Sequence, residues 1–180
     1  VVHTSNVLGI RNPIEEIISI SQKSGARVLI DAAQAVPHEE IDFDKLGADF
    51  MAFSAHKMCG PTGIGALLVN ESSFNEMEPF MGGGDMIETV TTEGSTYQSN
   101  EHRFEAGTPR IAEGFGWAAA LEWLESVDLK SHHSRLLKIA NRVAEELRSK
   151  GMKVYSSLRP GDAAVISFTH PTIHPEDFAR

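Results

Sequence analysis

The first 70 residues alternate short segments typical of strands, among them the nearly all-apolar residues 27–30, with helical patterns, and this alternation constrains the fold most. We expect strands at residues 1–6, 27–30, 49–54 and 65–69, and helices at residues 14–24 and 43–46. Strands without polar alternation are typical of a sheet that is covered on both faces. The order strand, helix, strand predicts a largely parallel sheet. The chain is therefore predicted to adopt an α/β fold.

Polar side chains follow three of these strands, at the point where each strand ends. Asn6 is the last residue of the first strand, and Asp31 follows the second. Ser54 is the last residue of the third strand, and His56 and Lys57 come shortly after it. Ligands of such sheets bind at the carboxyl ends of the strands. This shared placement predicts a binding site at one edge of the sheet.

Lys57 is a candidate for covalent chemistry with an aldehyde. It follows an apolar strand and precedes Gly60 and Gly63, so a small molecule can approach the backbone there. A neutral lysine amine forms a Schiff base with a carbonyl group. The neighbouring hydroxyl of Ser54 and imidazole of His56 suit a phosphate dianion. Most lysines simply lie at the surface, and that is the alternative reading of Lys57 alone.

Asp31 and Gln34 complete the pattern. A carboxylate beside a protonated pyridine nitrogen keeps the ring an electron sink, and an amide on the same turn can donate to the ring's phenolic oxygen. The alternative readings are that Asp31 caps the turn after its strand and that Gln34 is a solvated helix residue. Together with Lys57, the two residues indicate a site for pyridoxal 5'-phosphate (PLP).

Other groups are assigned no chemistry. Residues 60–65 lack the Gly-Lys-Ser/Thr ending of a phosphate loop, and a strand follows them. The single cysteine, Cys59, is expected to be a small buried residue rather than a nucleophile. The eight histidines show no metal-binding spacing. We therefore expect no metal site.

Composition excludes several classes of partner. The net charge of −9 argues against a nucleic-acid surface, and no apolar run is long enough to span a membrane. One cysteine allows no disulfide within the chain, which favours a reducing compartment, the cytoplasm.

The second half of the chain predicts a change of domain. Residues 71–110 have weak periodicity, and they are too long for a plain loop in a compact domain unless the segment is functional or packs on a partner chain. Helices are expected at residues 111–126 and 129–150, and strands at residues 152–155 and 164–169. We assign residues 1–125 to one large domain and residues 126–180 to the start of a small α+β domain.

Four segments resemble the class V aminotransferase superfamily, and most closely its cysteine desulfurase / selenocysteine lyase branch, which mobilises sulfur for iron–sulfur clusters. The segments are Ser5–Gly9, Asp31–His38, Phe53–Gly65 and Arg103–Pro109. The resemblance runs nearly end to end. It implies the PLP-dependent transferase (aspartate aminotransferase-like) fold, with most of a large domain and the start of a small one.

The resemblance also implies a role for each residue of the strand-end cluster. Lys57 would form the Schiff base with PLP. Asp31 would pair with the pyridine nitrogen, and Gln34 would contact the ring oxygen. Ser54 and His56 would bind the phosphate.

Two further residues receive roles only from the resemblance. Thr108 would reach across a homodimer interface to the phosphate in the neighbouring subunit. Asn6 would lie near the ring and the carboxylate of the substrate.

The implied reaction converts L-cysteine to L-alanine and passes the sulfur to a cysteine of the enzyme as a persulfide, from which a sulfur-acceptor protein could take it. In the family, the persulfide cysteine and the arginine that binds the substrate carboxylate lie beyond the equivalent of residue 180. We therefore expect no turnover from these 180 residues alone. The alternatives are a transaminase, a selenocysteine lyase or a kynureninase-like enzyme, or a truncated scaffold of the same fold without activity.

Overall fold

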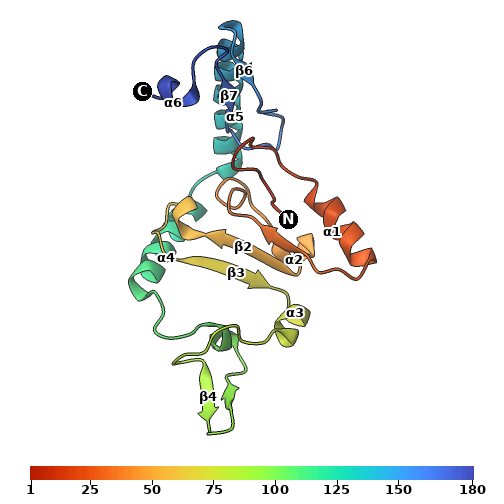
Figure 1. Ribbon diagram of the computed structural model, residues 1–180, viewed down its shortest axis with the longest axis vertical. Helices are drawn as coiled ribbons and strands as arrows, with labels where there is room; N and C mark the ends of the chain where they lie inside the picture. Colours follow the sequence, from red (N-terminus) through yellow and green to blue (C-terminus); the bar gives the residue numbers. More distant parts are fainter.

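A three-stranded sheet lies at the centre of the computed structural model, which describes residues 1–180 (Figure 1). Its strands are β1 (Leu29–Asp31), β2 (Phe50–Ser54) and β3 (Gly65–Val69), in that order. β1 and β2 are parallel, but β2 and β3 are antiparallel. The prediction of a largely parallel sheet is therefore right for β1 and wrong for β3. The short connection of residues 55–64 reverses the chain, whereas a parallel crossover needs about a dozen residues or more.

The predicted strand at residues 1–6 is wrong as a regular strand, although this segment does extend the sheet. Val2 forms a single parallel bridge with Asp31, and Thr4 forms an antiparallel bridge with Arg11. The backbone N–H of His3 donates to the Asp31 carbonyl at 2.9 Å. The segment therefore runs along the outer edge of β1.

The main hydrophobic core lies between this sheet and the helix α1 (Ile14–Lys23). Ile14 and Ile18 of α1 pack with Ile30 of β1 and Met51 of β2, and all four are buried. The helix α2 (Phe43–Leu46) adds Phe43 and Leu46 to this core. α1 therefore follows the prediction at residues 14–24, and α2 follows the one at residues 43–46.

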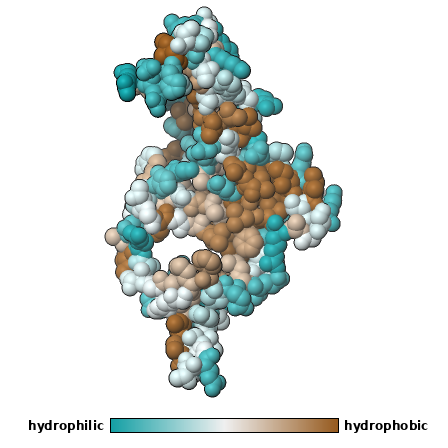
Figure 2. All heavy atoms as spheres, in the orientation of Figure 1, coloured by the Kyte–Doolittle hydropathy of each residue, from teal (hydrophilic) through white to brown (hydrophobic).

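The opposite face of the sheet is open and apolar. Leu29 and Leu67 lie on it and are 46% and 47% exposed. Figure 2 shows a broad apolar area over the part of the molecule that holds the N-terminus and the sheet. Side chains alternate along a strand, so the residues that pair across the strands share a face. Asp31 and Ser54 therefore lie on this open face.

Residues 71–110 contain regular structure despite their weak periodicity. They form α3 (Glu71–Glu76), a hairpin of β4 (Ile87–Val90) and β5 (Ser95–Tyr97), and a short 3₁₀ helix, η2 (Glu101–Phe104). The side chains of Asn70 and Asn100 accept backbone N–H groups at the starts of α3 and η2. These two asparagine caps are the sequence signals from which the starts of α3 and η2 could have been predicted.

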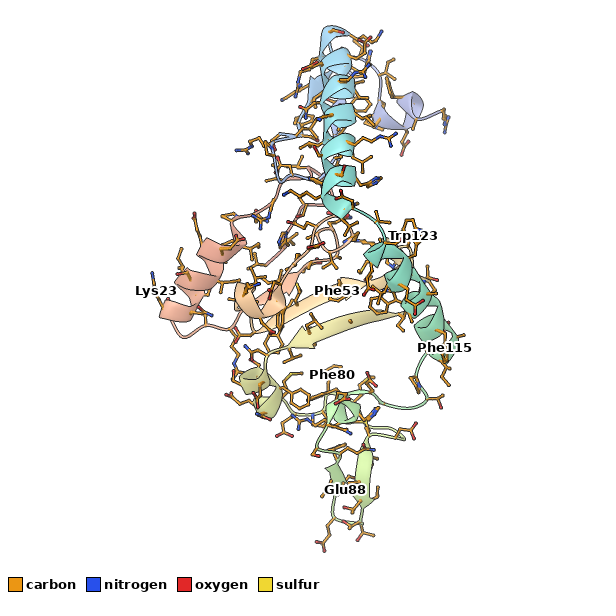
Figure 3. The ribbon with its side chains drawn as sticks, turned by 180° about the vertical axis from the view of Figure 1, so that it is seen from behind. Lys23, Phe53, Phe80, Glu88, Phe115 and Trp123 are labelled. Atoms are coloured by element: carbon orange, nitrogen blue, oxygen red, sulfur yellow. The ribbon has the colours of Figure 1, made fainter.

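The helix α4 (Ile111–Glu125) is apolar around most of its circumference, a pattern typical of a helix that is covered on all sides. Only part of it is covered within this chain. The ring of Trp117 packs edge-on against Phe53 of β2, with 6.0 Å between the ring centroids. Phe115 and Trp123, however, are 76% and 56% exposed (Figure 3).

A second, smaller core lies along the helix α5 (Leu129–Ser149), at the top of Figure 1. It contains Ala140 and Ala144 of this helix together with Leu158. The strands β6 (Lys153–Val154) and β7 (Phe168–Thr169) are shorter than predicted, and a final helical turn, α6, covers Pro175–Phe178. None of the helices is both long enough and apolar enough to cross a lipid bilayer.

His3 gives the fold a pH dependence. Its buried ring has Nδ1 3.0 Å from Thr4 Oγ1 and 3.6 Å from Glu39 Oε1. Burial, and then the positive charge of Arg11, lowers the pKa of His3 from 6.5 to about 4. The unfolded chain therefore binds the proton more readily than the folded chain does. The free energy of unfolding should fall as the pH drops from 6.5 towards 4.

We expect His3→Gln to flatten this dependence. Between pH 7.5 and pH 4.5 the wild type should lose on the order of 2 kcal/mol more stability than the variant, as measured by urea unfolding. Burial raises the pKa of Glu39, which acts in the opposite direction but is present in both proteins. Parallel pH profiles of the two proteins would contradict the assignment of a neutral, buried His3.

Candidate functional site

The ends of β1 and β2 bring Asp31 and Ser54 to one edge of the sheet. Asp31 pairs with Ala52 in the parallel register, and Ser54 is two residues further along β2. The N–H of Ala32 donates to the Ala52 carbonyl at 2.9 Å, which holds the two strand ends together. Because side chains two apart share a face, Asp31 and Ser54 face the same side.

A one-turn 3₁₀ helix, η1 (Ala55–Lys57), follows β2 directly and carries the lysine. Ala55 and Met58 are buried, and the Ala55 carbonyl accepts the N–H groups of Met58 and Gly60 at 2.8 and 2.9 Å. His56 is exposed and Lys57 is half-buried. The turn is therefore anchored by its alanine and methionine, while the imidazole and the amine remain accessible.

α4 supports this lysine turn through Trp117. A Cβ atom on Gly60 would lie 3.0 Å from both the Ala55 carbonyl oxygen and Trp117 Cδ1, so the close packing requires glycine. Sequence reasoning missed Trp117, because a contact so distant in the chain has no local signal. It was also wrong about Cys59, which is exposed and has a φ of +60°. The tight turn directs this cysteine outward.

The functional groups at this edge remain largely free to bind a ligand. One carboxylate oxygen of Asp31 accepts the N–H of Ala33 at 3.0 Å, so the turn-capping role exists, but the other oxygen has no hydrogen-bond partner. No hydrogen bond or ion pair within the chain occupies the side chains of Ser54, His56 and Lys57. The edge thus presents a carboxylate, a hydroxyl, an imidazole and a primary amine. This set fits the pyridinium, phosphate and aldehyde groups of PLP.

Gln34 lies on the turn after β1, but the structure shows its side chain in a different setting. It lines a cavity of about 80 Å³ together with Thr4, His38, Glu39, His133, Gly161 and Ala163. Gln34 therefore borders the C-terminal part of the chain. Its contact with a cofactor ring stays a prediction.

Asn6 and Thr108 lie away from the lysine turn in sequence and are both exposed. Asn6 is at the tip of the turn that follows the N-terminal segment, beyond the end of β1. Thr108 is separated from the start of α4 by Pro109 and Arg110, and no hydrogen bond joins it to Asp31 or Lys57. One chain alone therefore collects four of the seven predicted site residues at adjoining strand ends, namely Asp31, Ser54, His56 and Lys57.

Comparison with known proteins gives a consistent result. The family model for aminotransferase class V matches residues 1–180. A probable cysteine desulfurase of Streptomyces coelicolor is 43% identical over 98% of this chain. The apo structure of a cysteine desulfurase from Thermococcus onnurineus NA1 superimposes with a TM-score of 0.92 at 39% identity and covers 99% of this chain.

A second structure shares the fold at lower similarity. It is a variant of the cystine C–S lyase C-DES with glycine covalently linked to its PLP cofactor, and it has a TM-score of 0.81 at 24% identity, covering 94% of this chain. The chain spans less than half the length of these proteins, 43% of the Streptomyces protein, 45% of the Thermococcus chain and 46% of C-DES.

Proposed function

Because the chain belongs to the class V aminotransferase family, whose members depend on PLP, we propose that it is the cofactor-anchoring part of a cysteine desulfurase. The observation that carries this proposal is the sheet edge where Asp31 and the turn of Lys57 lie on adjoining, parallel strands. The similarity to cysteine desulfurases over nearly the whole chain supports the choice within the family.

Each residue at the edge is proposed to act on a different group. Lys57 holds the cofactor aldehyde and takes and returns the proton at Cα of L-cysteine. The free oxygen of Asp31 would pair with the ring nitrogen and stabilise its positive charge. Ser54 and His56 bind the phosphate. When bound, PLP supplies a ring that accepts electron density from the substrate carbon.

We extend the proposal to the assembly. Thr108 would bind the phosphate of the second subunit in a homodimer, and the exposed apolar residues that follow it on α4, Ile111 and Phe115, support an interface there. Gln34 and Asn6 would contact the ring oxygen and the substrate carboxylate. The two separate cores support a large domain of residues 1–125 and a small domain that starts at residue 126.

The proposed physiological role is the supply of sulfur to an acceptor protein for iron–sulfur cluster assembly. A single cysteine in these 180 residues supports a reducing compartment, the cytoplasm.

The activity test uses the full-length protein, loaded with PLP. We expect incubation with L-cysteine and a thiol reductant to release alanine and sulfide in equal amounts. Cys59→Ser should retain this activity, because the exposed thiol of Cys59 has no assigned step.

Other products would point to the other members of the family. Transfer of the amino group to a keto acid without sulfide would indicate a transaminase, and selenide from selenocysteine alone would indicate a lyase. Failure to bind PLP would reject the enzyme in favour of a scaffold.

A further inference from the structure

The turn that carries Asn6 is a compact loop, residues 5–11, which we call the Asn6 loop. The Ser5 hydroxyl oxygen accepts the N–H groups of Val7 and Leu8 at 3.2 and 3.1 Å. The N–H of Gly9 donates to the Ser5 carbonyl at 3.0 Å, and Gly9 has a φ of +72°. These bonds make the loop a stiff unit with Asn6 exposed at its tip.

The Asn6 loop is held by the C-terminal part of the chain at three points. The N–H of Arg11 donates to Asp162 Oδ1 at 3.0 Å, and the N–H of Ala163 donates to the Gly9 carbonyl at 2.8 Å. The Ser167 hydroxyl donates to the Val7 carbonyl. The packing is close, because a Cβ atom on Gly9 would lie 2.6 Å from the Ala163 carbonyl oxygen.

Asp162 is the charged centre of this contact and is buried, with 5% of its surface exposed. Its Oδ1 accepts from Arg11, while its Oδ2 accepts the Ser157 hydroxyl and the N–H of Arg159. Burial alone would raise the pKa of Asp162, but these hydrogen bonds outweigh it and hold the pKa below its usual value. The carboxylate is therefore ionised at neutral pH. Its Oδ1 binds the Asn6 loop and its Oδ2 binds the C-terminal segment, so it joins the two.

We propose that Asp162 is a positioning residue, which fixes the Asn6 loop beside β1 so that Asn6 meets the substrate at the sheet edge. The inference rests on the proposed function and deepens it. One end of the loop continues from the segment bridged to Asp31, and the other is bonded to Asp162. The position of Asn6 relative to Asp31 thus depends on the small-domain segment that carries Asp162. The substrate is therefore bound where the two domains meet.

Asp162→Asn is the most direct perturbation. It keeps the shape of the side chain but replaces one acceptor oxygen with an NH₂ donor, which must then face either the N–H of Arg11 or the donors Ser157 and Arg159. Asp44→Asn is the matched control, because Asp44 is exposed on α2. If Asp162→Asn fails to fold, Ser157→Ala replaces it in the experiment. This substitution removes one donor to the same carboxylate, and the same changes are expected from it.

The experiment compares these variants with Asn6→Ala and with the double variant Asn6→Ala/Asp162→Asn. All of them are made in the full-length protein and loaded with PLP. We expect Asp162→Asn to raise the KM for L-cysteine at least fivefold and to change kcat less than twofold. In the Asn6→Ala background the same substitution should leave KM unchanged, because Asp162 acts through Asn6. Amide hydrogen exchange in residues 5–11 should accelerate at least tenfold, while exchange in β2 stays the same.

An unchanged KM in Asp162→Asn, or effects on KM that multiply in the double variant, would overturn the positioning role. So would unaltered exchange in the Asn6 loop. A wild-type protein that binds PLP but releases no sulfide would reject the proposed function instead, and the exchange measurement would still decide whether Asp162 holds the loop.

Discussion

Lys57→Ala should remove the absorbance band of bound PLP and lower sulfide release by at least ~1,000-fold. In the proposed function, the amine of Lys57 is both the nucleophile for the cofactor aldehyde and the group that moves the proton at the substrate carbon. Acid–base catalysis by one side chain is worth about 10²–10⁴ in rate. Lys57 has no partner within the chain, so its loss should leave the fold intact.

Lys23→Ala is the control for this change, because Lys23 is an exposed lysine at the end of α1 (Figure 3). It should retain both the band and the activity. Spectra and sulfide release would be measured on both variants after loading with PLP. An unaltered band in Lys57→Ala would contradict the assignment of this lysine.

Asp31→Asn should lower kcat/KM about 100-fold, which corresponds to about 2.7 kcal/mol of transition-state stabilisation. An asparagine can still accept the N–H of Ala33, so the turn after β1 is kept. The substitution removes only the negative charge that we propose to pair with the ring nitrogen, and the ring would then be a weaker electron sink.

Steady-state kinetics with L-cysteine and a PLP titration check this expectation. The exposed Asp44 provides the matched control, Asp44→Asn, which should behave as the wild type. A value of kcat/KM for Asp31→Asn within twofold of the wild type would show that Asp31 only caps its turn.

The sequence predicted the strand ends well because their signal is local. The predicted strand at residues 49–54 ends at Ser54, as β2 does, and the one at residues 27–30 ends one residue before β1, which starts later than predicted and includes Asp31. The antiparallel direction of β3 was predictable too, since only ten residues separate it from β2. The prediction of a parallel strand followed the strand–helix alternation of the first 70 residues and not the length of that connection.

Contacts between distant residues were beyond prediction from one sequence. The predicted strand at residues 164–169 shortens to Phe168–Thr169, because the N–H of Ser167 donates to the Ser156 hydroxyl and the N–H of Val165 donates to the Ala163 carbonyl, both at 2.8 Å, instead of to a neighbouring strand. Similarly, nothing near Gly60 in the chain indicates that Trp117 packs against it. Burial of this kind is decided by tertiary packing rather than by propensity.

Mapping the lysine that carries PLP tests the central claim most directly. The PLP-loaded protein would be reduced with borohydride, digested and analysed by mass spectrometry to locate the cofactor adduct. We predict a single adduct on the peptide that contains Lys57. An adduct on any other lysine, or none at all, would contradict a cofactor site at the joined ends of β1 and β2.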